Sequence, residues 1–535
     1  MRVFVCLMLA LSMAAHLSLV AAATDPATTV EVRWSNQFTV TVNEVTGPGA
    51  AWSSLPIGTN FFNVYQYEFK KTWGDRKFSF GTGVNLSSSK TTDPKSLVLS
   101  RLELQYSLPG HAWAIGDTMA SFSPYALSGS AKGLTYQYTD PKRKSADISL
   151  VYGIAYPRWD NFWDSDTATR SIQRKVSGAR ISKAGKKFDW GFSAVRTEDS
   201  GRITPYDYLY DNLLFAADWE MRPDEFWTFN GEHSRSGGSY TKEEGAVAEG
   251  MQGWAHRISA VRAAGRQRFS LEWEEVTPQY TTLMGSATVD RERVKLGYRD
   301  RLSRNVTWRF TNLWFRDNLD GQKYYGTQTW QPELGISIGR MFKREYAVLD
   351  LAHRVNAQTY LDGYVRDHTT VLGYRDRFGA VDAELNAELS AYDTYGMYRS
   401  YELMHNLTLS TTSTRGKASL SPTLYMGFWR AQEALNTYYR DERWEMSLGL
   451  AFTDQTSHLS GSVKAGTNRL LKTDGGDNSD KWFANLELRW KPPYLNKKYR
   501  DASLFVRWLL NDFRFTTTTN NYRESSLAFG INLEY

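Results

Sequence analysis

Apolar side chains recur at every second position up to the last residue of this 535-residue chain. In the closing stretch SSLAFGINLEY, residues 525–535, large apolar residues alternate with Ala, Gly, Asn and Glu. Successive side chains of a β-strand point to opposite faces, so this period predicts a strand with one apolar and one polar face. A strand that reaches the terminal carboxylate is unusual, because chain ends generally fray.

The same alternation marks segments far from the C-terminus, among them SRLELQYSL (100–108), NVTWRFTN (305–312) and KWFANLELRW (481–490). Helical spacing is nowhere sustained, and about 26 alternating segments can be placed between residues 28 and 535. The composition agrees, because aromatic residues make up 14% of the chain and there are 40 Gly but only 15 Pro. The sequence therefore predicts an all-β protein.

The first 26 residues, MRVFVCLMLALSMAAHLSLVAAATDP, have the pattern of a secretory signal peptide. Arg2 precedes an apolar run that ends at the small residues Ala21-Ala22-Ala23. The alternative is an N-terminal anchor helix, but the run is short for that role. We expect a signal peptide at residues 1–23 and one β-domain at 24–535. Cys6 is the only cysteine, so the mature chain would have no disulfide, thiolate metal site or covalent c-type haem.

After this leader no stretch approaches the roughly 18 apolar residues of a transmembrane helix, and the mean hydropathy is −0.50. A closed β-barrel could still span a membrane, because only every second side chain would face lipid. The connections support a barrel, since short ones such as TWGDRK (72–77) and KAGKK (183–187) alternate with longer ones such as PRWDNFWDSDTATR (157–170). The first and last connections, 45–58 and 511–522, both belong to the long set, which predicts an even strand count.

A terminal alternating strand with a final aromatic residue resembles the C-terminal recognition signal of bacterial outer-membrane β-barrel proteins. The residues that carry the resemblance are Phe529, Ile531, Leu533 and Tyr535. It implies handling by the barrel-assembly machinery and pairing of the last strand with the first. We expect an antiparallel transmembrane barrel of about 24–26 strands, with short periplasmic turns and long extracellular loops, in contact with the bilayer and lipopolysaccharide. A soluble β-solenoid or propeller would repeat at a fixed period, and none is found.

Few residues in the sequence suggest reactive chemistry. The histidines form no metal-ligand or nucleophile motif, so we expect neither enzymatic activity nor a bound cofactor. Asp474, Asp477 and Asp480 could bind calcium but lack EF-hand spacing, and a solvated loop tip explains them better. The net charge of +6 is scattered rather than clustered, which argues against nucleic acid as a partner. In IGDTMASFSPYALSGSAKGL (115–134), glycines interrupt two predicted strands that a medium loop joins. Glycines in strands often mark bends or close backbone approach, so this stretch is either a functional site or a structural loop.

Charged residues occupy the polar face of several predicted strands. On the lipid face each would cost about 2–4 kcal/mol at the membrane midplane, so we expect this face to line the lumen. Basic residues outnumber acids, which predicts either a mild preference for anions or simply a hydrated wall. The predicted pore-lining residues are Arg101, Glu103, Arg293, Lys295, Arg309, Glu487, Arg489 and Arg507.

These features predict a porin-like channel for passive diffusion of small solutes or ions across the outer membrane. Strand-like sequence begins by Val30, which leaves no room before it for the plug of an energised receptor. A barrel this wide needs an obstruction, and the candidates are long links that fold inward, chiefly 157–170 and 235–250, or a partner chain. The aromatic and acidic stretch within 157–170 could instead roof the barrel. The alternative is a non-channel scaffold that sheathes a partner, such as a multihaem cytochrome in a trans-membrane electron conduit, because wide barrels are usually plugged.

Overall fold

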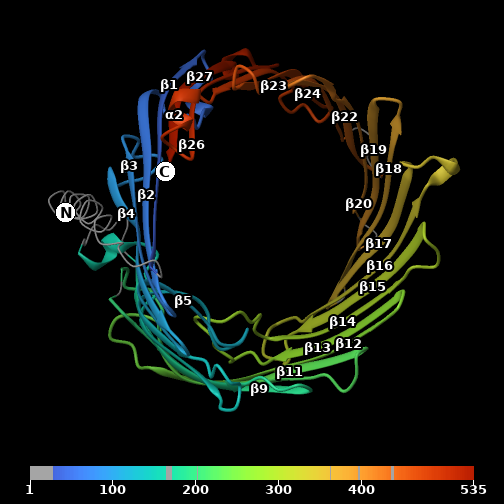
Figure 1. Ribbon diagram of the computed structural model, residues 1–535. Helices are drawn as coiled ribbons and strands as arrows, with labels where there is room; N and C mark the ends of the chain where they lie inside the picture. The colour runs from blue at the N-terminus through green and yellow to red at the C-terminus, as the bar shows by residue number, and fades with distance from the viewer. Residues whose placement is uncertain (1–27, 164–170, 202, 362, 396–397, 435–438) are drawn as a thin grey trace.

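The computed structural model describes residues 28–163, 171–201, 203–361, 363–395, 398–434 and 439–535. Over these ranges the chain forms one antiparallel sheet that closes into a ring (Figure 1). The predicted signal peptide, residues 1–23, lies outside the described residues. In the ranges just given, no helix is long and apolar enough to cross a bilayer.

Consecutive strands pair as neighbours around the ring, with bounds as follows. The first half comprises β1 (Thr28–Thr46), β2 (Gly58–Trp73), β3 (Arg76–Ser87), β4 (Leu97–Leu108), β5 (His111–Ser121), β6 (Ser128–Tyr138), β7 (Asp147–Ile154), β8 (Gln173–Lys183), β9 (Phe188–Ser200), β10 (Leu209–Met221), β11 (Trp227–Thr241), β12 (Glu249–Ala264) and β13 (Gln267–Val276). The second half comprises β14 (Arg291–Asp300), β15 (Val306–Asp317), β16 (Thr327–Gly339), β17 (Val348–Tyr360), β18 (Gly363–Phe378), β19 (Val381–Thr394), β20 (Tyr398–Thr411), β21 (Ser413–Arg415), β22 (Ala418–Glu433), β23 (Arg440–Asp454), β24 (Leu459–Lys472), β25 (Ser479–Trp490), β26 (Asp501–Phe515) and β27 (Tyr522–Glu534).

Helical structure in the described ranges is confined to connections. The short turns are η2 (Ala50–Trp52), η3 (Trp159–Phe162), η4 (Met341–Lys343), α2 (Pro493–Asn496) and η5 (Thr518–Asn520). The three-residue β21 only extends the hairpin between β20 and β22, so 26 of the 27 strands build the wall. This confirms the predicted barrel, and the count lies within the expected range.

The last strand closes the barrel on the first. β27 pairs with β1 from Ser35↔Glu534 to Thr46↔Arg523. Beyond that register, the Trp34 N–H donates to the Tyr535 carbonyl at 3.2 Å, the Tyr535 N–H donates to the Trp34 carbonyl at 2.8 Å, and the two rings stack. The pairing predicted from the C-terminal motif is therefore confirmed. It also explains the ordered terminus, because the final residue is held by backbone and ring contacts.

Deleting Tyr535 is expected to lower the amount of assembled barrel in cells strongly while changing the finished fold little. The deletion removes one stacked ring and one pair of backbone hydrogen bonds, a loss of about 1–3 kcal/mol in a sheet with many more. As part of an assembly signal, however, it would act before insertion. Immunoblots of outer membranes, compared with refolding in detergent, separate the two effects. Tyr535→Phe keeps the ring and is the control; unchanged abundance of the deletion in cells would contradict a signalling role.

Connection lengths alternate around the ring much as the sequence predicts. At one end the turns are short, as at 74–75, 109–110 and 265–266. At the other end lie long connections such as 88–96 and 277–290. The alternation has exceptions, since 340–347 and 491–500 are long connections at the short end, and 361–362 and 395–397 are short ones at the long end. With an even number of strands, both ends of the sheet lie at the short-turn end.

The two faces of the wall differ sharply in polarity. On β10, Leu213 and Phe215 are 42% and 55% exposed, while Leu214 between them is 1% exposed. The exposed apolar face recurs around the ring, for example at Leu334, Trp482 and Phe529. An apolar belt this extensive would be unfavourable in water and is the outer surface of a membrane-spanning barrel. The opposite face is the inner wall.

Candidate functional site

The predicted pore-lining residues all lie on strand faces opposite the apolar belt. Several are held in ion pairs along or between strands. These pairs are Arg101 with Glu103 at 2.7 Å, Arg309 with Glu333 at 3.1 Å, and Glu487 with both Arg489 at 3.3 Å and Arg507 at 3.1 Å. Lys295 lies opposite Glu272 in the register of β13 and β14. Basic residues on this wall are thus largely matched by acids, which favours the hydrated wall over the mild anion preference.

Arg293 belongs to the densest of these charge networks. Its guanidinium contacts both Glu272 and Glu274 of β13, and Glu272 also accepts a hydrogen bond from Arg257 of β12 at 2.9 Å. Arg180 and Asp218 continue the pattern between β8 and β10. Opposite charges alternate across this part of the inner wall, and the carboxylates named here each lie beside a basic group, which offsets the cost of burying them.

Two connections fold inward against this wall. They are residues 122–127, between β5 and β6, and residues 277–290, between β13 and β14; both lie inside the ring near the β5 label (Figure 1). Their aromatic residues Phe122, Tyr125 and Tyr280 are buried. They form one apolar core with inward-facing residues of β7 to β13, among them Val151, Val176, Val195, Leu214, Ala255 and Val276. The inner wall is apolar here because it is covered by protein.

Hydrogen bonds tie these inward segments to the wall. The Tyr280 and Ser234 hydroxyls lie 2.8 Å apart, and the Glu232 carboxylate accepts a hydrogen bond from the Tyr125 N–H at 3.0 Å. The Thr281 N–H donates to the Ser236 hydroxyl at 2.9 Å.

The two segments are also bonded to each other. The Ser128 N–H donates to the Met284 carbonyl, and the Ser286 N–H donates to the Pro124 carbonyl, each at 2.7 Å. Together with the apolar core, these bonds make a fixed ledge that narrows one side of the lumen. We call residues 122–127 and 277–290 the inner ledge.

Within the described residues, neither of the two links that were candidates for the obstruction folds into the lumen. In the described part of 157–170, Trp159 packs on Val84 and Leu99, which belong to the apolar outer face. Residues 164–170 lie outside the described residues. Most of 235–250 is strand, because β11 runs to Thr241 and β12 begins at Glu249; the glycines at 237 and 238 pair in register with β10. The remaining link, 242–248, lies at the rim, where the Glu244 N–H donates to the Pro205 carbonyl.

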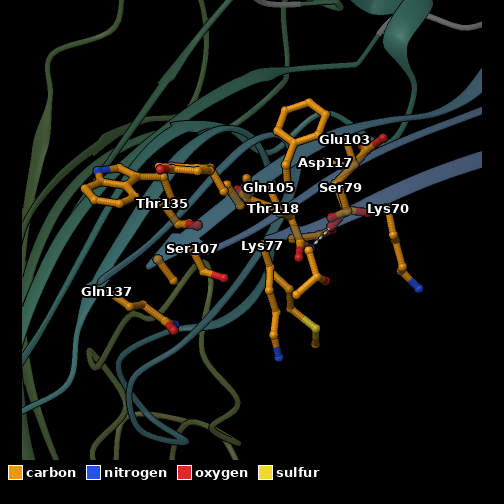
Figure 2. A pocket seen from close by; sticks show the side chains of 18 residues that line it. Lys70, Lys77, Ser79, Glu103, Gln105, Ser107, Asp117, Thr118, Thr135 and Gln137 are labelled. Atoms are coloured by element: carbon orange, nitrogen blue, oxygen red, sulfur yellow. Dashed lines mark hydrogen bonds between the residues drawn. The ribbon is translucent and has the colours of Figure 1, made fainter. Parts of the chain in front are cut away.

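A groove lies on the inner side of β2 to β6, next to the strands that carry the inner ledge. It has a volume of about 610 Å³, and its polar lining includes Gln105 and Ser107. Figure 2 shows the side chains of Lys70, Lys77 and Gln137 directed toward the same side of the sheet, into the lumen. The groove thus presents two ammonium groups, of which that of Lys70 pairs with Glu68 at 3.0 Å, together with the Glu103 carboxylate and several neutral polar groups.

The acidic loop considered for calcium is part of a turn network. The Asp477 carboxylate accepts hydrogen bonds from the Thr517 N–H at 2.7 Å and the Asn520 amide at 2.9 Å. Asp480 pairs instead with Arg469 on β24. Among the described residues, no three His, Cys, Asp or Glu side chains gather as metal ligands. The loop-tip interpretation fits these contacts.

Comparison with known proteins gives a likeness of architecture. No family model matches the chain, and no curated protein matches it. Among solved structures, the outer-membrane transporter YddB from Escherichia coli has a TM-score of 0.45 at 10% identity, over 94% of this chain and 81% of that one. The anion-selective porin from Comamonas acidovorans has a TM-score of 0.30 at 10% identity, over 54% of this chain and 89% of that one. At such low identities and scores, neither bears on what this chain transports.

Proposed function

We propose that the chain forms a porin-like pore for passive diffusion of small hydrophilic solutes across the outer membrane. The observation that carries the proposal is a closed sheet whose outer face is apolar and whose inner face is lined by ion pairs. Charged and hydroxyl side chains on the inner wall keep it hydrated, and water in the lumen lets polar solutes cross without losing their hydration. The inner ledge limits the passage on one side, so the pore is narrower than the ring of strands.

Planar-bilayer recording of the purified protein tests this proposal. A porin with an inner ledge should give stable steps of moderate conductance. A single very large conductance would instead favour the sleeve-like scaffold, whose lumen is filled by a partner such as a periplasmic multihaem cytochrome. The scaffold remains the second candidate because the apolar core beneath the inner ledge is built from β5 to β13 and their connections, on one side of the ring. Co-purification of a haem protein would distinguish it, and an absence of conductance would contradict the pore.

We expect the protein to fractionate with bacterial outer membranes. Unheated samples should migrate differently from boiled ones on a denaturing gel, because a closed sheet with all strands paired resists detergent. The measurement is the heat-modifiable band in membrane and periplasmic fractions. Recovery in the soluble periplasm without such a band would contradict the membrane assignment.

Reversing inner-wall charges should shift ion selectivity toward cations. Lys295→Glu with Arg309→Glu replaces two positive charges by two negative ones on the water-filled face. Arg293 is a third predicted pore-lining residue. It is left unchanged because a glutamate there would lie beside Glu272 and Glu274 and destabilise the fold. Reversal potentials under a salt gradient measure the shift, and the paired Gln variant, which removes charge without reversing it, should move them about half as far. An unchanged reversal potential in the double Glu variant would place these side chains outside the ion path.

A further inference from the structure

One pair of neighbouring strands separates part of the way across the wall. β4 and β5 pair from Leu108↔His111 to Glu103↔Gly116, and the pairing ends there. Both strands continue: β4 reaches back to Leu97 while still paired with β3, and β5 reaches Ser121 while paired with β6. The halves of β4 and β5 nearer the long connections are therefore not paired with each other by backbone hydrogen bonds, although each is paired with its other neighbour. We call this stretch the seam.

Gly116 is the residue at which the strands part. Its φ of +102° lies in the region that favours glycine, and a Cβ atom there would overlap the carbonyl oxygen of Leu102. Only glycine permits the backbone of β5 to pass so close to β4 and then diverge. The glycines singled out in the sequence between residues 115 and 134 thus include one with a specific geometric role.

Side chains, rather than backbone, bridge the seam. The Asp117 carboxylate accepts hydrogen bonds from the Leu102 N–H at 2.7 Å, the Trp159 indole N–H at 2.8 Å and the Lys132 ammonium at 2.7 Å. The Lys132 side chain is only 9% exposed. The Asp117 carboxylate therefore joins the two strands where their backbones are no longer paired. These side-chain hydrogen bonds can break and re-form without disturbing the backbone pairing of β4 and β5 between Glu103↔Gly116 and Leu108↔His111.

The outer side of the seam is covered by a short connection instead of a strand. Trp159 of η3 packs on Val84 and Leu99, and the Lys132 ammonium lies 4.9 Å from its ring centre. Arg158, next to it, pairs with Asp93 at 3.0 Å in the connection between β3 and β4. Burial alone would raise the pKa of Asp93, but hydrogen bonds from Arg158 and a backbone N–H hold that pKa below its usual range. The Asp93 carboxylate is therefore ionised at neutral pH, in the form that pairs with Arg158.

The inner side of the seam opens into the groove of Figure 2. Thr118, just past the point of divergence, lines this groove on the inner side, whereas Met119, which also borders it and is 75% exposed, shares the outer face of β5 with Ile115 and Asp117. The same groove presents the ammonium groups of Lys77 and Lys70 on the side nearer the short turns, and Lys70 also pairs with Glu68 at 3.0 Å. An acidic headgroup would be matched by these lysines, and a flexible apolar chain by methionine and the apolar residues around the seam.

We propose that the seam is a lateral opening, latched by Asp117, through which an amphiphile with an acidic headgroup and an apolar chain passes between the groove and the bilayer. On the inner side it meets Lys70 and Lys77, and on the outer side Met119 and the apolar patch beneath Trp159. The proposal requires only that the barrel spans the membrane. It holds whether or not the lumen conducts, so conductance measured on the same vesicles separates its failure from that of the pore.

A reversible lock across the seam tests the proposal. Leu102→Cys with Asp117→Cys removes the latch when reduced and replaces it by a covalent link when oxidised; Cys6, the only native cysteine, lies in the predicted signal peptide. Vesicles would contain a photoactivatable fatty acid, and mass spectrometry would map the labelled residues. We expect labelling at Lys70 and Lys77 in the reduced protein and a several-fold loss on oxidation. The control pair, Val463→Cys with Leu486→Cys, joins register partners on β24 and β25 and should be insensitive to oxidation.

A second variant covers the case in which the disulfide does not form. Asp117→Ala should increase groove labelling several-fold over the unmodified protein, while Asp218→Ala, which removes an inner-wall carboxylate far from the seam, should not. Labelling of the outer belt serves as the internal standard. Equal groove labelling in the reduced and oxidised pair, or no increase in Asp117→Ala, would overturn the lateral route.

Discussion

Replacing residues 278–289 of the inner ledge with a short Gly-Ser turn is expected to raise single-channel conductance several-fold. This segment lies across the inner faces of β10 to β13, where Tyr280 and the residues packed beneath it occupy lumen space. Conductance rises with the cross-section of the water-filled path, so removing the obstruction on one side should widen the narrowest point. Steps in planar bilayers measure the change, and the heat-modifiable band shows whether the variant still closes.

The matched control is a similar shortening of the rim link within residues 242–248. This link joins β11 and β12, lies close to the ledge strands in sequence, and makes a rim contact to Pro205 instead of packing in the lumen. Conductance should stay near that of the unmodified protein. Equal conductance in all three proteins would mean that the ledge does not set the limit. A rise in the rim variant alone would restore the gate first expected at residues 235–250.

Gly116→Val should sharply reduce the fraction of correctly closed barrel. A side chain at this position faces two penalties, a φ of +102° and overlap with the Leu102 carbonyl. A strained backbone of this kind costs about 1–3 kcal/mol, and the steric conflict in a paired sheet adds to it, with β-branched valine worse than alanine. The expected order of folded fraction is glycine, then alanine, then valine, measured by the heat-modifiable band after refolding at increasing urea.

Gly237 provides the control for this series. It also lies within a strand, on β11, but a Cβ atom there meets nothing within 4 Å. Gly237→Ala should leave the folded fraction nearly unchanged or raise it slightly, because alanine loses less conformational freedom on folding. If Gly116→Val folds as well as Gly237→Ala, the backbone at residue 116 does not need glycine, and the divergence of β4 and β5 has another cause.

Local sequence was sufficient for the strands and for their two faces. The period of two in residues 525–535 places Phe529 on the outer belt and predicts a strand up to Tyr535, and both hold in the structure. Charged positions such as Arg309 and Glu487 fall on the inner face for the same reason, because a misplaced charge would meet lipid. Closure also followed from the C-terminal motif, since every edge strand in a membrane must find a partner.

The direction in which each connection folds was decided only by tertiary contacts. Residues 157–163 are rich in aromatic side chains, as a pore constriction would be, yet Trp159 packs on the outer face. Its indole N–H donates to Asp117, a residue 42 positions earlier in the chain that only the folded sheet brings close. Residues 277–290 have no sequence pattern that predicts an inward fold. They fold inward because small apolar residues of strands distant in sequence form a surface that Tyr280 covers. A two-residue period is a property of neighbouring positions, whereas the side of the wall that a loop covers depends on residues brought together only when the sheet closes.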